Sequence, residues 1–149
     1  MAHKQPISVL VLIHTPDLEV LLLERADKPG YWQSVTGSRE NEESLRETAI
    51  REVQEETGLD AERYNLADWQ LSNEYEIYPH WRHRYAPEVT HNIEHVFGLE
   101  LPSAMPVTLA PDEHLRYEWV NWREAATKVF SWTNVHALRT LGERHGLTL

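Results

Sequence analysis

The sequence predicts an α/β protein in which helices cover a mixed β-sheet. Three observations favour this class. Aliphatic runs of strand length occur near the start, at residues 6–14 (PISVLVLIH) and 19–25 (EVLLLER). A stretch with helical periodicity, residues 44–57, follows them, and alternating runs come after it. Because the 149 residues contain no repeats and no linker, we expect a single domain over residues 1–149.

The first strands are expected to form a hairpin. Thr15, Pro16 and Asp17 stand between residues 6–14 and 19–25 and are turn formers. After a further break at Lys-Pro-Gly, residues 31–36 (YWQSVT) read as a third short strand that ends at the next glycine.

Residues 44–57 carry the clearest helical pattern. Ser44 and Glu47 have the spacing of a capping box at the N-terminus, and Gly58 is a typical C-terminal stop. Apolar residues recur at every fourth position: Leu45, Ala49 and Val53.

The second half of the chain predicts more strands and then helices. Residues 64–101 alternate polar with apolar side chains, which indicates two or three strands. After a proline-rich loop, residues 114–120 (HLRYEWV) predict one more strand. A capping pattern at Asn121 opens a helical segment that we expect to be interrupted at residues 131–134 and to end near Gly146.

Composition limits the partners. The formal net charge is −10, so the field of the protein opposes binding to nucleic acids and to anionic membranes, and we expect neither partner. No window approaches the roughly 20 apolar residues of a membrane span, and no cleavable signal is evident, so a cytoplasmic location is expected. Cysteine is absent, so any metal must be held by oxygen or imidazole. The nine histidines form no convincing zinc-ligand set.

Three glutamates share one face of the predicted helix. Glu52, Glu55 and Glu56 are spaced i, i+3 and i+4, where like charges repel, and the last two sit where the helix dipole favours cations. A hard divalent cation such as Mg²⁺ or Mn²⁺ would compensate for both effects. The alternative is an ordinary solvated acidic face.

These glutamates stand inside a longer pattern. The spacing resembles the Nudix hydrolase box, GX5EX7REUXEEXGU, and this sequence matches it at nine positions: Gly37, Glu43, Arg51, Glu52, Val53, Glu55, Glu56, Gly58 and Leu59. The resemblance implies a Nudix-type αβα sandwich that hydrolyses a nucleoside diphosphate linked to another group.

By position, the resemblance also implies roles for single residues. Glu52, Glu55 and Glu56 would be metal ligands, with the Gly37 carbonyl as a further one. Glu52, Glu55 and a glutamate on a distant loop are all candidates for the general base. Arg51, Glu43 and Gly58 would have structural roles, the first two by pairing to brace the loop. One position departs from the common pattern, because Glu42 replaces a frequent glycine; Asn41 is expected to supply the left-handed turn instead.

Three further segments narrow the resemblance to one branch of the family. Residues 31–38, 81–92 and 131–134 look like those of dihydroneopterin triphosphate pyrophosphatases, which act in folate synthesis. The resemblance implies that Glu113 is an additional metal ligand with a catalytic role. It also implies substrate contacts from four residues: Lys4, Arg25, Thr36 and Ser131.

The segment HWRHRY, residues 80–85, is the only dense basic and aromatic run. Arg82 and Arg84 are candidates for phosphate contacts. The alternative is a strand that packs its aromatic side chains on the core, with both arginines on one face.

The leading hypothesis is therefore Mg²⁺-dependent hydrolysis of dihydroneopterin triphosphate to the monophosphate and pyrophosphate, with Mn²⁺ able to substitute. A pyrophosphohydrolase of nucleoside triphosphates such as dATP is the alternative. A nucleotide-sensing Nudix domain without activity is less favoured, because no box carboxylate is missing. The oligomeric state and the number of metal ions are left open.

Overall fold

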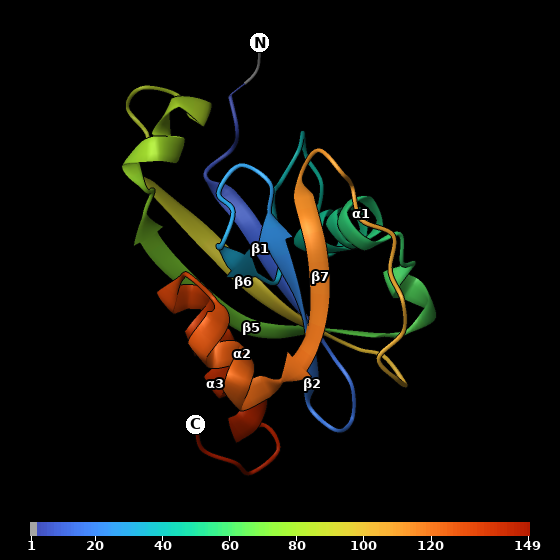
Figure 1. Ribbon diagram of the computed structural model, residues 1–149. Helices are drawn as coiled ribbons and strands as arrows, with labels where there is room; N and C mark the ends of the chain where they lie inside the picture. Colours follow the sequence, from blue (N-terminus) through green and yellow to red (C-terminus); the bar gives the residue numbers. More distant parts are fainter. Residues whose placement is uncertain (1–2) are drawn as a thin grey trace.

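The computed structural model describes residues 3–149 and contains one mixed sheet with helices on both faces (Figure 1). The seven strands are β1 (Ile7–His14), β2 (Glu19–Arg25), β3 (Trp32–Gln33), β4 (Val35–Ser38), β5 (Asn65–Glu76), β6 (His91–Glu100) and β7 (His114–Asn121). The helices are α1 (Leu45–Thr57), α2 (Trp122–Lys128) and α3 (Trp132–Glu143), with 3₁₀ turns η1 (Ala61–Arg63) and η2 (Pro79–Arg84).

Strand β1 is the centre of the sheet. It pairs in parallel with β6 and antiparallel with β2 and β4, while β5 flanks β6 and β7 flanks β2. The sheet is therefore mixed, as expected.

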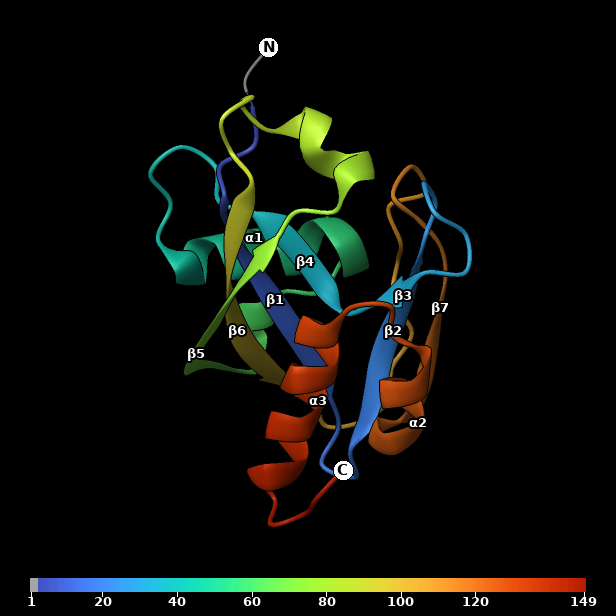
Figure 2. The same cartoon turned by 90° about the vertical axis from the view of Figure 1, so that its left-hand side faces the viewer.

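Alternation along β1 divides the core into two layers. Val9, Val11 and Ile13 face the α1 side, and Leu10 and Leu12 face the side of α2 and α3. Figure 2 shows α1 behind the sheet and α3 in front of it. The αβα sandwich is confirmed.

Helix α1 begins and ends where the sequence predicts. Ser44 is the N-cap and forms both bonds of the capping box with Glu47, and Gly58 ends the helix in the left-handed region with φ of 74°. Asn41 has φ of 52°. The expected left-handed turn at Asn41 is confirmed.

Three expected boundaries differ in the structure. The predicted strand over residues 31–36 is split into β3 and β4, because the Ser34 amide donates to Asn134 Oδ1 of α3 at 2.8 Å. Strand β4 then continues through Gly37 to Ser38. The C-terminal interruption falls at residues 129–131 instead of 131–134, since α2 ends at Lys128 and Ser131 is already the N-cap of α3.

The interpretation of residues 80–85 as a strand is wrong. Pro79 opens the 3₁₀ turn η2, and proline cannot donate to a strand ladder. At about three residues per turn, Arg82 and Arg84 point in different directions instead of sharing a face.

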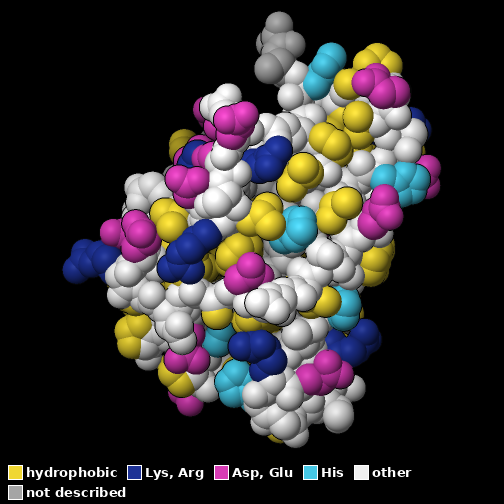
Figure 3. All heavy atoms as spheres, turned by 180° about the vertical axis from the view of Figure 1, so that it is seen from behind, with side chains coloured by type: hydrophobic (Ala, Val, Ile, Leu, Met, Phe, Trp, Pro, Cys, Tyr) yellow, Lys and Arg dark blue, Asp and Glu magenta, His cyan; other side chains and the backbone are white. Residues whose placement is uncertain are grey.

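Surface features add two findings. Among residues 3–149, no helix is long and apolar enough to span a membrane. On the face drawn in Figure 3, lysine and arginine side chains are scattered singly among acidic ones.

Candidate active site

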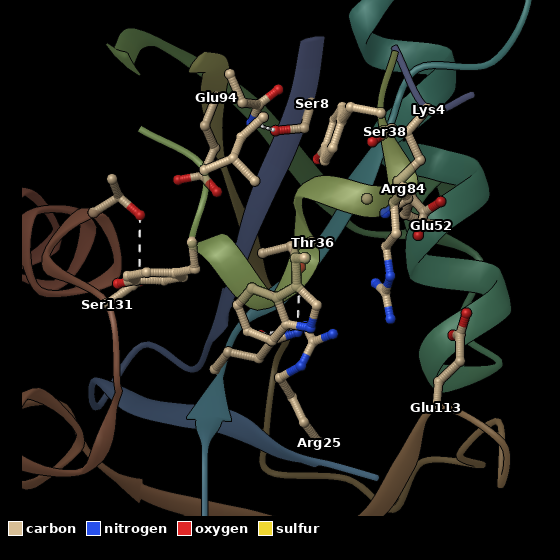
Figure 4. Close-up of a pocket in the computed structure, with 18 of the residues that line it drawn as sticks. Lys4, Ser8, Arg25, Thr36, Ser38, Glu52, Arg84, Glu94, Glu113 and Ser131 are labelled. Carbon is tan, nitrogen blue, oxygen red and sulfur yellow. Dashed lines mark hydrogen bonds between the residues drawn. The ribbon is translucent and has the colours of Figure 1, made fainter. Parts of the chain in front are cut away.

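A cavity of about 750 Å³ lies where β4, the last turns of α1, η2 and the start of α3 meet. This volume is within the usual range for small-molecule sites, about 300–1,000 Å³. Figure 4 places Glu52, Glu113, Lys4 and Arg84 along one side of the cavity.

A glycine permits the close approach of α1 to β4. A Cβ atom on Gly37 would lie 1.9 Å from the carboxyl carbon of Glu52, so only glycine leaves room for the Glu52 side chain. Glu52 and Glu56 are thereby held in the protein interior, with side chains 12% and 3% exposed. Glu55, one turn from Glu52, is 48% exposed at the mouth.

Arg51 organises the loop and the helix. Its Nε and Nη2 atoms donate to the two oxygens of Glu43, at 2.7 and 3.0 Å, and Nη2 also donates to the Ser38 carbonyl at 2.9 Å. The structure thus pairs Arg51 with Glu43 as the resemblance implies. The remaining Nη1 donates to Glu52 at 2.6 Å and to Glu55 at 2.9 Å.

The buried carboxyl groups resist carrying charge together. Burial raises the pKa of Glu52, and burial, with the adjacent Glu52 and Glu113, raises the pKa of Glu56 well above its ordinary value. His114 Nε2 lies 3.7 Å from Glu56 Oε1. Burial lowers the pKa of His114 to about 4, so this imidazole is uncharged near neutral pH and does not balance Glu56.

These residues fit a hard divalent cation. Glu56 Oε1 is buried without a hydrogen-bond partner, and a cation beside it would neutralise both interior carboxylates. Within residues 3–149, no three acidic or histidine side chains already converge on one point as metal ligands. Glu55 is instead paired with Arg51 at 2.9 Å, so ligation of a metal by Glu55 would require its carboxylate to leave Arg51.

A cationic wall adjoins the carboxylates. Arg25 forms a bidentate pair with Asp27 at 2.8 and 2.9 Å, and its guanidinium lies 4.3 Å from the ring centre of Trp81. Arg84 donates to the same aspartate at 3.0 Å, and Trp81 Nε1 does so at 2.9 Å. The Arg25 guanidinium holds the pKa of Asp27 well below its usual range, so this aspartate stays charged and fixes both arginines.

The other expected substrate residues also lie at the cavity, except one. Lys4 lines it beside Arg84, and burial lowers the pKa of Lys4. Thr36 accepts a hydrogen bond from Gln33 at 3.2 Å, and the Ser131 hydroxyl caps α3 by accepting from the Asn134 amide at 3.2 Å. Gly37, Glu55 and Glu113 line the cavity too, but Arg82 is not among its lining residues.

Sequence reasoning missed other residues of the cavity. Asp27 could have been found from its position in the sequence, because an acid two residues after Arg25 can pair with that arginine where the chain turns. Glu94 had a weaker signal: it keeps the parity of the buried Val96 in β6, which places a carboxylate at an inward position. Three aromatic rings also cluster with centres 5.6–5.8 Å apart: Tyr78, Trp81 and Phe130. The sequence gives no sign of this cluster, because it joins η2 to the segment before α3.

Comparisons with known proteins agree with this arrangement. The family model "NUDIX domain" matches residues 4–141. The chain is 45% identical over 139 residues to the dihydroneopterin triphosphate diphosphatase of Escherichia coli, covering 91% of each protein. It is 42% identical to the enzyme of that name from Haemophilus influenzae, covering 93% of this chain and 89% of the relative.

Solved structures give the same result. The E. coli dihydroneopterin triphosphate pyrophosphohydrolase superposes with a TM-score of 0.88 at 44% identity, covering 94% of this chain and 97% of the other. The C. elegans Ap4A hydrolase superposes with a TM-score of 0.71 at 19% identity, over 94% and 97% of the two chains, which indicates a shared fold only. The chain therefore belongs to the Nudix hydrolase family, in the branch whose named members are dihydroneopterin triphosphate diphosphatases.

Proposed function

We propose that this enzyme hydrolyses dihydroneopterin triphosphate to dihydroneopterin monophosphate and pyrophosphate, using Mg²⁺ or, in its place, Mn²⁺. The observation that carries the proposal is the interior pair Glu52 and Glu56 in a cavity that also holds a cationic wall, with Glu56 Oε1 left without a hydrogen-bond partner. Nudix hydrolases generally use divalent metal ions. The names of the relatives supply the substrate.

In this proposal the carboxylates of Glu52, Glu55, Glu56 and Glu113 hold the cations, and the Gly37 carbonyl supplies a further oxygen. Bound there, divalent cations neutralise phosphate oxygens and lower the pKa of water. Oxygen ligands on a rigid helix suit Mg²⁺, which prefers carboxylate and water oxygens in octahedral geometry.

Arg51 positions the acidic groups before substrate arrives. By donating to Glu43 and the Ser38 carbonyl, its guanidinium fixes the loop against the helix. Its Nη1 atom holds Glu55 at the mouth. Glu55 is then a carboxylate that can turn from Arg51 toward the cavity, either as a ligand or to accept the proton of the attacking water.

The cationic wall binds the anionic chain of the substrate. Arg25 and Arg84 present planar guanidinium groups, whose paired N–H donors can bind two phosphate oxygens at once, and Lys4 adds an ammonium group beside them. The aromatic group of Tyr78, Trp81 and Phe130 stands next to this wall, so a fused ring can stack there while the triphosphate reaches the glutamates.

The decisive experiment measures pyrophosphate release from dihydroneopterin triphosphate and the common nucleoside triphosphates, with Mg²⁺, with Mn²⁺ and with chelator. We expect a kcat/KM at least tenfold higher for dihydroneopterin triphosphate, and loss of all activity with chelator. A tenfold preference for a nucleotide such as dATP would refute the pterin assignment and favour the nucleotide pyrophosphohydrolase.

A further inference from the structure

One further carboxylate of the cavity lies apart from the residues proposed to hold metal and phosphate. Glu94 of β6 lines the cavity but is only 4% exposed, and its Oε1 atom is buried without a hydrogen-bond partner. Figure 4 shows Glu94 next to Ser8, on the side of the cavity away from Glu52 and Glu113.

Strand register connects this end of the cavity to the metal end. Ser8 of β1 pairs with Glu94 on one side and with Ser38 of β4 on the other. Two strand spacings, about 10 Å, therefore separate Glu94 from Ser38. The Ser38 carbonyl is bonded to Arg51, which contacts Glu52, so the cavity runs from the acidic helix across three strands to Glu94.

The surroundings of Glu94 satisfy only part of its hydrogen-bonding capacity. The side-chain amide of Asn92 donates its two hydrogens to the Ser8 hydroxyl at 2.7 Å and the Tyr75 hydroxyl at 3.1 Å, so neither is available to Glu94. Asn73 lies directly opposite on β5, and its Oδ1 atom accepts a hydrogen bond from His136 Nδ1 at 3.0 Å.

Burial raises the pKa of Glu94 to about 7, and the Thr133 hydroxyl offsets this only in part, with no charged group contributing. A buried carboxylate without a cation is costly unless a ligand donates to it.

We propose that Glu94 binds the amino–lactam edge of the substrate ring, accepting one hydrogen bond from the ring N–H and one from the neighbouring exocyclic amino group. A 2-amino-4-oxo pyrimidine edge, as in a pterin or in guanine, presents these two donors side by side. The matching edge of adenine presents one donor and one acceptor, so its acceptor would face a carboxylate oxygen. The pterin identity rests on the proposed function, whereas the choice of edge rests on Glu94 alone.

The selectivity follows from the cost of unpaired polar groups. A site built to receive two hydrogen bonds discriminates strongly against a ring that supplies one, because a buried oxygen is then left unpaired. The aromatic side chains of Phe130 and Trp132 also line the cavity, so a ring held at its edge by Glu94 has apolar faces to stack against.

The test is Glu94→Gln, which keeps the shape but replaces one acceptor by a donor. For the variant we expect KM to rise at least tenfold for dihydroneopterin triphosphate and for dGTP, with kcat changed less than threefold. KM for dATP should stay the same or fall. Glu100→Gln, at the other end of β6 and outside this cavity, is the matched control and should leave all three values unchanged.

A binding measurement with a ligand that lacks phosphate tests recognition of the ring alone. Fluorescence titration with 7,8-dihydroneopterin, which carries no phosphate, should show binding to the wild type and at least tenfold weaker binding to Glu94→Gln. Glu94→Asp keeps both acceptors and should retain the preference for guanine over adenine. That variant also serves if the glutamine variant folds poorly.

Two results would overturn the inference: an unchanged ratio of the KM values for dGTP and dATP in Glu94→Gln, or loss of the guanine preference in Glu94→Asp. Failure of the proposed function looks different. If the wild type prefers dGTP to the pterin and Glu94→Gln removes the preference over dATP, the substrate assignment fails while the role of Glu94 stands.

Discussion

Gly37→Ala tests how the glutamate helix is seated against the sheet. The added methyl would lie 1.9 Å from the carboxyl carbon of Glu52, and 2.1 and 2.4 Å from its oxygens. Non-bonded carbons settle near 3.5 Å, so the Glu52 carboxylate must move by about 1.5 Å. A displacement of about 1 Å at a reacting centre can cost 10²-fold in rate. We therefore expect kcat/KM to fall at least about 10²-fold, close to 3 kcal/mol of transition-state stabilisation.

Stability should change little in the same variant. The backbone of Gly37 is not in the left-handed region, and alanine restricts the unfolded chain, which stabilises by about 0.4–1 kcal/mol. The atoms that must move are the end of a flexible side chain. The unfolding free energy, measured by denaturant titration, should thus stay within about 1 kcal/mol of the wild type.

Two controls separate displacement of Glu52 from other effects. In a Glu52→Ala background there is no carboxylate to displace, so Gly37→Ala should lower kcat/KM less than threefold further. Gly98→Ala instead places a methyl 2.3 Å from the Trp69 ring, and should lower stability by about 1–3 kcal/mol while leaving Mn²⁺ affinity intact. Wild-type activity in Gly37→Ala, or an equal loss in both backgrounds, would refute this reasoning.

Three further predictions concern single side chains. Glu56→Gln keeps shape but removes a charge, so Mn²⁺ affinity and kcat/KM should each fall about 10²-fold; near wild-type turnover at saturating metal would contradict the metal role. Arg51→Lys cannot make the bidentate pair with Glu43 and should lower the unfolding free energy by about 1–3 kcal/mol, more than the control Arg46→Lys. Burial of Glu94 raises its pKa from about 4.5 to about 7, so the folded state holds a proton that the unfolded state releases between these pH values. As the pH rises from 4.5 to 7, the wild type should therefore lose about 3 kcal/mol of unfolding free energy relative to Glu94→Gln. Parallel stability profiles of the two proteins from pH 5 to 8 would show that the Glu94 carboxyl does not titrate in this way.

The features that the sequence predicted best depend on neighbouring residues. The capping box of Ser44 and Glu47, the left-handed Asn41 and the stop at Gly58 are all local, and the structure contains each of them. The pairing of Glu43 with Arg51 is also short in range, since Glu43 stands directly before the N-cap Ser44 and Arg51 follows eight residues after Glu43, in α1.

The features that were wrong or absent depend on contacts between distant segments. The break between β3 and β4 comes from Asn134, which lies 100 residues beyond Ser34 in the sequence. The burial of Glu94 requires α3 to cover β6, which the parity of a single strand does not reveal. For residues 80–85 the strand alternative is wrong for a local reason, because Pro79 favours the turn that forms.

The most direct test of the central claim is anomalous diffraction from crystals of the enzyme grown with Mn²⁺ and a slowly hydrolysed substrate analogue. We predict at least one Mn²⁺ peak bound by carboxylate oxygens of Glu52 and Glu56, at about 2.0–2.2 Å, with Glu55 turned away from Arg51. Strong Mn²⁺ peaks elsewhere, with Glu52 and Glu55 still paired to Arg51 while the analogue occupies the cavity, would contradict the account.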